Sequence, residues 1–228
     1  MLKRMQQPVP IRTAERIQAL IGESGLGVGD ALPGQRQLAA TLGVSRPSLR
    51  EALSILETLG IIRVEAGRAA FVADGSGGGG SESPWRYGAF YSLRDVYQTR
   101  VVIEGMAAGL TALAVHGEVI AEFTAICDAM DDAAASRDPV ALAGADARFH
   151  DLTLSLCGNA LFQKIYRDTR DVFVESQRVP MVERARLAET AAEHRAVLDA
   201  FRARDMDGAR AAMESHIRNA AARAGLSV

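Results

Sequence analysis

Three stretches between residues 11 and 60 carry hydrophobic residues three or four positions apart, which is the period of an α-helix. The first stretch covers residues 11–24, the second is short and covers 34–43, and the third covers 45–60. The repeating apolar positions of the third stretch are Leu49, Ala52, Leu53 and Leu56. We therefore expect three helices, each with one buried face.

The pattern changes to alternation over residues 61–72. Ile62 and Val64 alternate with charged residues, a turn is expected at residues 66–67, and an apolar pair follows at 71–72. Alternating residues on both sides of a short turn are typical of a β-hairpin.

Residues 73–84 read ADGSGGGGSESP and separate this region from the rest of the chain. A run of glycine and serine is typical of a flexible linker. Beyond it, the hydrophobic period is helical throughout and no long alternating stretch occurs. The predicted helices cover residues 92–115, 118–135, 139–156, 160–176, 182–203 and 206–224.

Composition shows that the chain can form a core, and the distribution of charge bears on its partners. Hydrophobic residues make up 48% of the chain and charged residues 24%, so the chain can form an ordinary globular core. The net charge is −2, but residues 1–73 carry nine Lys/Arg and six Asp/Glu, whereas residues 74–228 carry seventeen and twenty-two. A net charge of +3 followed by −5 indicates an anionic partner at the N-terminal end.

Cys127 and Cys157 lie far apart and outside any CxxC motif, so we expect two reduced thiols in the core. The first residues lack the apolar segment of a signal peptide. The longest uncharged apolar run, residues 105–117, is too short to span a bilayer. We therefore expect a cytoplasmic protein with no membrane partner.

The beginning of the third predicted helix carries polar residues that suit DNA binding. Ser45 is placed as the N-cap, and Arg46 and Arg50 lie one turn apart on the face opposite the apolar stripe. Two arginines at a helix N-terminus in the major groove can reach base edges and phosphates, and nearby serines can donate to phosphate. Each arginine alone is better explained as a solvated residue, but the joint pattern favours a helix-turn-helix followed by a hairpin wing.

Residues 31–72 also resemble the winged helix-turn-helix of GntR-type bacterial transcription regulators, whose pattern runs LPSER-LA, GVSR-xVREAL, L-x-x-GL and GRGTFV. The resemblance covers most of residues 11–73. It implies that DNA is contacted by Arg36, Ser45, Arg46, Ser48, Arg50 and Gly67. One winged helix-turn-helix domain contacts only half of an operator, so the resemblance implies a homodimer on a roughly palindromic double-stranded operator.

Two departures from the family pattern occur. Gly34 and Gln35 stand where the family has serine and glutamate before the second helix, although glycine is still an acceptable cap. Ala69 replaces a glycine in the wing, which changes the geometry expected at the wing tip.

Three of the four histidines fall inside predicted helices. Asp146 and His150 are four residues apart and share a helix face, while His194 and His216 lie on two other helices within or beside an apolar stripe. His116 precedes a glycine at a helix end, where the helix dipole favours histidine. From spacing alone, hydrogen-bonded core histidines are a better explanation than a three-helix metal site.

The motifs DARFH, GNALF, EHRAVLDAFRARD and MESHI occur in this order and resemble the C-terminal ligand-binding domain of the FadR subfamily, over roughly residues 92–224. In the metal-binding branch of that domain, an aspartate and three histidines hold a divalent ion. The resemblance therefore implies a metal site made of Asp146, His150, His194 and His216. Three imidazoles and one carboxylate suit Zn²⁺, Ni²⁺ or Mn²⁺.

Together these patterns predict a mainly α chain. We expect a winged helix-turn-helix DNA-binding domain in residues 1–74, with three helices and a hairpin wing. A Gly-rich flexible linker follows in residues 75–84, and an all-α antiparallel bundle that binds metal and effector occupies residues 85–228.

The resemblance implies a small organic acid as effector, such as a hydroxy acid, a sugar acid or a dicarboxylate. Arg100 and Asn159 are candidates to bind its oxygens, since arginine pairs with carboxylates in a bidentate manner. Each candidate also has a simpler role that stays open: Arg100 can form a surface salt bridge with Glu104, and Asn159 can serve only as a helix cap.

We therefore expect a regulator, most simply a repressor, whose operator binding responds to an acid held at the metal ion. One alternative is a metal-dependent hydrolase or lyase that acts on a small acid and carries a fused DNA-binding head, because such sites can activate water. Against it, Asp151 and Glu193 adjoin two ligands but lie about a hundred degrees around their helices from them. A purely structural metal ion is a third possibility.

Overall fold

A computed structural model of the chain describes residues 8–65, 70–74 and 85–228. The chain divides into two compact units, residues 1–83 and residues 84–228. The predicted linker over residues 75–84 lies outside the described residues, and so do Gly67 and Ala69 of the predicted wing.

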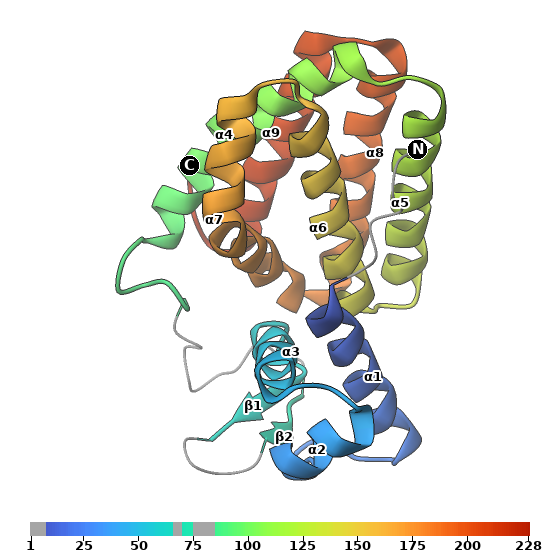
Figure 1. The fold of residues 1–228 in the computed structure, drawn as a ribbon, viewed down its shortest axis with the longest axis vertical. Helices are drawn as coiled ribbons and strands as arrows, with labels where there is room; N and C mark the ends of the chain where they lie inside the picture. Colours follow the sequence, from blue (N-terminus) through green and yellow to red (C-terminus); the bar gives the residue numbers. More distant parts are fainter. Residues whose placement is uncertain (1–7, 66–69, 75–84) are drawn as a thin grey trace. The chain divides into compact units, whose positions relative to one another are not determined.

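The first unit contains the three helices and the hairpin that the hydrophobic pattern predicts (Figure 1). Its elements are α1 (Val9–Glu23), α2 (Gln35–Leu42), α3 (Arg46–Thr58), β1 (Ile62–Val64) and β2 (Ala70–Val72). Both α1 and α2 pack against α3, and the two strands pair in antiparallel fashion with Ile62 opposite Val72.

Local sequence explains where α2 and α3 begin and end. Gly34 caps α2 at its N-terminus without a side-chain bond, and Gly43 ends the helix in the left-handed conformation at φ 64°. The hydroxyl of Ser45 accepts a hydrogen bond from the Ser48 backbone N–H at 3.3 Å, as expected of an N-cap. The predicted apolar stripe of α3, beginning at Leu49, is buried. The chain therefore builds a short helix, a tight turn and a capped second helix.

The second unit is helical among its described residues (Figure 1). Its α-helices are α4 (Leu93–Ala114), α5 (Gly117–Ala135), α6 (Pro139–Leu156), α7 (Ala160–Arg178), α8 (Leu187–Ala203) and α9 (Met206–Arg223). The helix predicted to begin at residue 182 begins at Leu187 instead. Two short 3-10 segments, η1 (Val179–Val182) and η2 (Arg184–Arg186), lie between α7 and α8.

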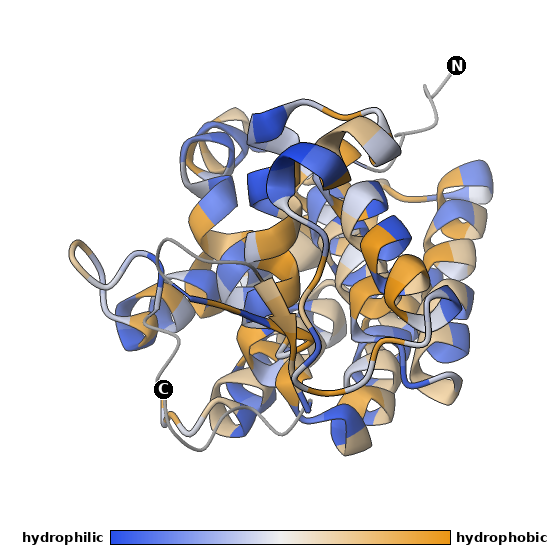
Figure 2. Ribbon diagram, turned by 90° about the horizontal axis from the view of Figure 1, so that it is seen from below, coloured by the Kyte–Doolittle hydropathy of each residue, from blue (hydrophilic) through white to orange (hydrophobic). Residues whose placement is uncertain are grey.

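The core of the second unit is built from aromatic residues and from close packing of α4 against α9. Phe123 of α5 lies with its ring centroid 4.9 Å from those of Phe149 on α6 and Phe201 on α8. The backbones of α4 and α9 approach closely at Gly109, where an added Cβ would lie 2.9 Å from the Met206 carbonyl oxygen. Figure 2 shows that the helices carry both hydrophobic and hydrophilic positions, as expected of surface helices around a core.

Both cysteines, Cys127 and Cys157, are buried and form no disulfide, as predicted. Among the described residues, no helix has the length and the apolar character needed to cross a membrane.

Candidate metal centre

Three helices of the second unit bring Asp146, His150, His194 and His216 together. The first two lie one turn apart on α6, His194 lies on α8, and His216 lies on α9. Each residue offers one ligand atom, and these atoms all lie within 4.8 Å of one another. All four side chains are buried. The four residues that the sequence singled out therefore form one compact cluster.

The geometry within the cluster is that of groups facing a common point. The Nε2 atom of His194 lies 3.4 Å from Asp146 Oδ1, and the Nε2 atom of His150 lies 3.8 Å from Asp146 Oδ2. The ring centroids of His194 and His216 are 4.3 Å apart. These separations leave space for one ion between the side chains, because metal–ligand bonds are about 2.0–2.2 Å long for nitrogen and oxygen.

The Nδ1 atom of each imidazole faces an oxygen atom outside the cluster. The Thr190 carbonyl oxygen accepts from His194 Nδ1 at 2.8 Å. Glu193 Oε2 accepts from His216 Nδ1, also at 2.8 Å, and Glu104 Oε2 faces His150 Nδ1 as an ion pair. Carbonyl and carboxylate oxygens only accept, so they place the proton on Nδ1 and leave Nε2 as a potential metal ligand.

Several buried atoms of the cluster have no hydrogen-bond partner among the described residues. They are Asp146 Oδ2, His150 Nε2, His194 Nε2 and His150 Nδ1, the last of which is in ion-pair contact with Glu104. Buried polar atoms are nearly always paired in folded proteins, so such a group of atoms in one place needs an explanation. A divalent cation would satisfy the first three atoms, and the donor set of three imidazoles and a carboxylate fits such an ion.

Burial and neighbouring charges shift the pKa values of the three histidines in different directions. Burial lowers the pKa of His194 well below its usual range, and the neighbouring His216 and His150 lower it further. Burial also lowers the pKa of His216, although the hydrogen bond to Glu193 opposes this effect. A lowered pKa favours the neutral imidazole, which is the form that binds metal.

His150 behaves differently because two carboxylates face it. Burial by itself would lower the pKa of His150, but the charges of Glu104 and Asp146 outweigh burial and raise the pKa. A cation in the cluster would compete with the proton that these carboxylates favour.

The expectation of a surface salt bridge at Arg100 is wrong in one respect: the pair exists, but it is buried. Arg100 and Glu104 are both fully inaccessible to solvent, and Arg100 Nε donates to Glu104 Oε1 at 2.6 Å. Arg100 Nη1 donates to the Ser176 hydroxyl at 3.2 Å, whereas Nη2 has no hydrogen-bond partner among the described residues. Because α4 is covered by α6, α7 and α9, the face carrying this pair cannot reach water.

Asn159 caps a helix, which is one of the two roles that the sequence left open. Its side-chain oxygen accepts from the backbone N–H groups of Leu161 and Phe162, at 3.0 and 3.2 Å. These bonds fix the beginning of α7. Contact of Asn159 with an effector stays a prediction.

Sequence reasoning missed Glu104 and Glu193 as partners of the histidines. Glu193 was compared only with His194 beside it on α8, but it contacts His216 on α9. It also pairs with Arg223, whose two terminal nitrogens donate to it at 2.8 Å each. Asp151 contacts Arg170 instead, and each of its carboxylate oxygens accepts a hydrogen bond from an Arg170 nitrogen at 2.7 Å.

The one histidine outside the cluster is His116, which is exposed and lies between α4 and α5. It directly precedes α5 and does not end a helix, contrary to expectation.

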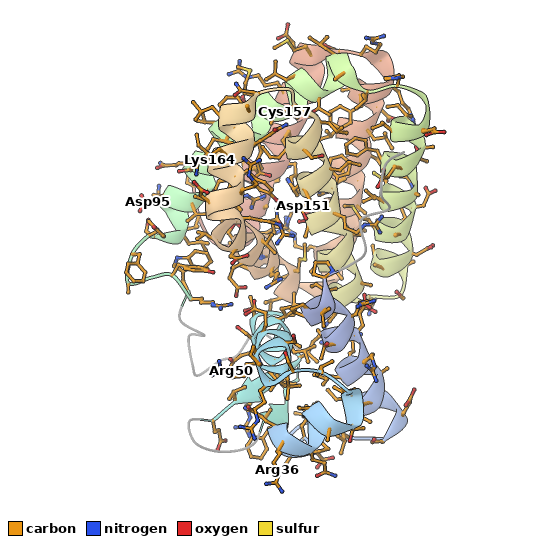
Figure 3. All side chains as sticks on the ribbon, in the orientation of Figure 1. Arg36, Arg50, Asp95, Asp151, Cys157 and Lys164 are labelled. Carbon is orange, nitrogen blue, oxygen red and sulfur yellow. The ribbon has the colours of Figure 1, made fainter. Side chains whose placement is uncertain are left out.

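The residues predicted to contact DNA lie at the surface of the first unit wherever they are described. Arg36, Ser45, Arg46 and Arg50 are exposed, and Ser48 is half-buried. Figure 3 shows Arg36 extending away from the ribbon of α2. The hydroxyls of Ser45 and Ser48 are 2.9 Å apart, so the start of α3 presents a hydroxyl pair beside Arg46.

Comparison with known proteins covers both units. Residues 12–72 match the family model described as "Bacterial regulatory proteins, gntR family", and residues 95–219 match that of the FCD domain. The chain is 32% identical over 228 residues to the "Putative L-lactate dehydrogenase operon regulatory protein" of Escherichia coli K12, a match covering 90% of this chain and 81% of that protein.

Two further similarities agree with this match. The chain is 26% identical over 224 residues to the HTH-type transcriptional repressor NanR of Citrobacter rodentium, covering 91% of this chain and 82% of that protein. The solved structure of E. coli McbR/YncC shares the fold, with a TM-score of 0.52 and 17% identity over 93% of this chain and 94% of that chain.

The named relatives are transcription regulators and not enzymes, which rules against the hydrolase or lyase alternative. The two family models match the two units in order along the chain. The first unit carries exposed arginines on α3, and the second unit is helical among its described residues. The chain therefore belongs to the GntR family of bacterial transcription regulators and carries a C-terminal FCD domain.

Proposed function

We propose that this regulator is a repressor controlled by a small organic acid, which binds at a divalent metal ion held by Asp146, His150, His194 and His216. The observation that carries the proposal is the convergence of four buried ligand atoms within 4.8 Å. Asp146, His150 and His194 each contribute an atom that lacks a hydrogen-bond partner among the described residues. The metal is Zn²⁺, Ni²⁺ or Mn²⁺, which suit this donor set.

Arg100 supports an acid as the effector. Its Nη2 group is buried and has no hydrogen-bond partner in the described part of the chain, while its Nε is held by Glu104, which in turn contacts the metal ligand His150. A guanidinium N–H that is fixed and unpaired can bind one oxygen of a carboxylate. The name of the E. coli relative refers to an L-lactate dehydrogenase operon, so L-lactate is the first acid to test.

The proposed output is binding to an operator by a homodimer in the cytoplasm. One head presents a single recognition helix, α3, and reads half of a roughly palindromic site. Arg46 and Arg50 would contact bases or phosphates, and Ser45, Ser48 and Arg36 would contact phosphates. Gly67 would belong to the wing.

DNA recognition can be tested with labelled DNA from the region upstream of the chain's own coding sequence and with a shuffled duplex of equal length. Wild-type protein should bind the upstream DNA more tightly, and its affinity should fall steeply with salt. The double variant R46A/R50A should lose most of this preference, because each base-contacting arginine contributes about 1–3 kcal/mol.

The matched control removes an exposed arginine from the second unit. Arg218 lies on α9 and pairs with Glu214, so R218A changes the net charge without touching α3. It should bind the upstream DNA like the wild type. Equal binding of both duplexes by wild-type protein would overturn the proposed recognition.

A further inference from the structure

Glu104 occupies a position between the arginine proposed to bind the effector and a ligand of the proposed metal ion. Its Oε1 accepts from Arg100 Nε at 2.6 Å, and its Oε2 faces His150 Nδ1 as an ion pair. All three side chains are 0–1% exposed. Each oxygen of one carboxylate is therefore committed to a different functional residue.

We propose that Glu104 is a positioning residue that couples effector binding to metal binding, by holding Arg100 and His150 in one rigid unit. This inference rests on the proposed function and extends it to the way in which the acid is sensed. An acid that pairs with Arg100 acts on a guanidinium whose other edge is bound to Glu104. Any resulting shift of Glu104 reorients the His150 ring and changes how its Nε2 faces the metal.

The chemistry of a carboxylate is required for this double contact. Arg100 Nε–H and His150 Nδ1–H are both donors, so the residue between them needs an acceptor at each end. Glutamate has two acceptor oxygens, whereas glutamine has one acceptor and one donor. A glutamine in place of Glu104 would therefore satisfy only one of the two donors and would leave the charge of Arg100 unpaired beside a cation.

The residues that accept hydrogen bonds from the other two histidine rings do not contact both a histidine and Arg100. His194 is held by the backbone carbonyl of Thr190, and His216 is held by Glu193, whose other partners are Asn219 and Arg223. Glu193 thus resembles Glu104 in its effect on a histidine but has no contact with Arg100 among the described hydrogen bonds. It provides a matched control within the same cluster.

Ser176 fixes the opposite end of the same unit. Its hydroxyl accepts from Arg100 Nη1 at 3.2 Å, and its carbonyl oxygen accepts from the Tyr97 hydroxyl at 2.9 Å. Arg100 is therefore held at two of its three nitrogens, and Nη2 is the one that stays available to an acid. A guanidinium fixed in this way transmits displacement instead of absorbing it by rotation.

Coupling of this kind is reciprocal: an acid that raises the affinity for metal is itself bound more tightly when metal is present. The test is a Zn²⁺ titration of the full-length chain against a chromophoric chelator, with L-lactate or with chloride at the same ionic strength. Three proteins are compared: the wild type, E104Q and E193Q. Circular dichroism of the metal-free proteins checks that each variant folds.

The wild type should bind Zn²⁺ at least about five-fold more tightly with L-lactate, which is the lower end of typical allosteric coupling. Both variants should bind Zn²⁺ about 10–100-fold more weakly than the wild type, because each loses the partner that orients a ligand. E193Q should keep the L-lactate effect, and E104Q should lose it. If E104Q does not fold, E104D makes the same test, since it keeps the charge but is too short to bridge both donors.

Different experimental results would contradict different parts of this inference. An E104Q or E104D protein with the L-lactate response of the wild type would overturn the coupling role, and one with wild-type Zn²⁺ affinity would overturn the positioning role. A wild type that binds no Zn²⁺, or binds it with no response to L-lactate, would contradict the proposed function itself, and the inference would fall with it.

Discussion

At the scale of single residues, the ring nitrogens of the histidine cluster on α6, α8 and α9 have two kinds of neighbour. The Nδ1 atoms of its imidazoles face oxygen atoms of Glu104, Thr190 and Glu193, and the Nε2 atoms of His150 and His194 face Asp146. Hydrogen-bonded core histidines would have both ring nitrogens satisfied. The unpaired Nε2 atoms therefore favour a metal site over that explanation.

Removing one ligand tests the metal site directly. The variant H194A should lower the affinity for Zn²⁺ by more than about 100-fold, because loss of a ligand costs more than loss of a ligand's hydrogen-bond partner. The measurement is a chelator competition titration at pH 7.5. The control is H116A, which removes an exposed histidine outside the cluster and should bind like the wild type. Equal affinity of H194A and H116A would contradict the assignment.

The buried thiols give a residue-scale prediction that depends on pH. Burial raises the pKa of Cys127 to about 12, so the native protein carries very little thiolate at this position at pH 8. A thiol reagent should modify Cys127 only after unfolding. Because an unfolded thiol ionises near pH 8.5, ionisation should also favour the unfolded state increasingly above that pH. Rapid modification of the folded protein at pH 8 would contradict the burial of this side chain.

Residue patterns predicted the cluster but not its surroundings. Asp146 and His150 share a helix face by their spacing, and the family resemblance supplied His194 and His216. The roles of Glu104 and Glu193 depend on how α4, α6, α8 and α9 pack, which spacing along one helix does not determine. The same limit explains why one of the two roles left open for Arg100 placed it at the surface, whereas it is buried.

At the scale of elements, close helix packing positions the site. Helix α4 carries Arg100 and Glu104 and packs against α9, which carries His216. Gly109 permits this approach, because a Cβ there would meet the backbone of Met206. The positions of the site residues on these two helices therefore depend on a glycine that is not itself a proposed ligand or effector-binding residue.

Alanine at two helical glycines should have opposite effects on stability. G109A should destabilise the second unit by about 1–2 kcal/mol, because overpacking against a backbone carbonyl outweighs the gain in helix propensity. G22A, in α1, meets no atom within 4 Å and should stabilise the first unit by up to about 1 kcal/mol. Thermal unfolding followed by circular dichroism measures both. Stabilisation by G109A would show that α4 and α9 are less tightly packed than described.

The two roles considered for Asn159 can be separated by a single substitution. N159D keeps an acceptor oxygen for the N–H groups of Leu161 and Phe162 but loses the amide donor. If the residue is only a cap, N159D should match the wild type both in stability and in its Zn²⁺ response to L-lactate. We expect a lost response at unchanged stability, which would assign the amide to effector binding; an unchanged response would remove Asn159 from the effector site.

Helix positions were largely predictable, and the exception has a physical reason. The hydrophobic periods placed most helix boundaries to within a few residues, and in the structure Ser92 caps α4 and Pro139 begins α6. Residues 179–186 instead form two 3-10 segments after α7. The predicted helices left residues 177–181 outside a helix, but residues 182–186 were assigned to the following helix because their apolar and charged residues continue a helical period.

At the scale of the whole molecule, the chain joins a DNA-reading unit to a unit built around a candidate metal centre. Regulation requires that an acid bind with different affinity to the DNA-binding and non-binding states of the protein. In the proposed function, the metal centre would hold the acid and α3 would contact the operator. The central claim is that the acid acts on DNA binding only through the metal centre.

Fluorescence anisotropy of labelled upstream DNA tests this claim most directly. The affinity of wild-type protein and of H194A is measured with Zn²⁺ or with EDTA, each with and without L-lactate at constant ionic strength. The account predicts that L-lactate weakens DNA binding of the Zn²⁺-loaded wild type by at least about five-fold and has no effect on the EDTA-treated protein or on H194A. An equal L-lactate effect with and without metal would contradict the account.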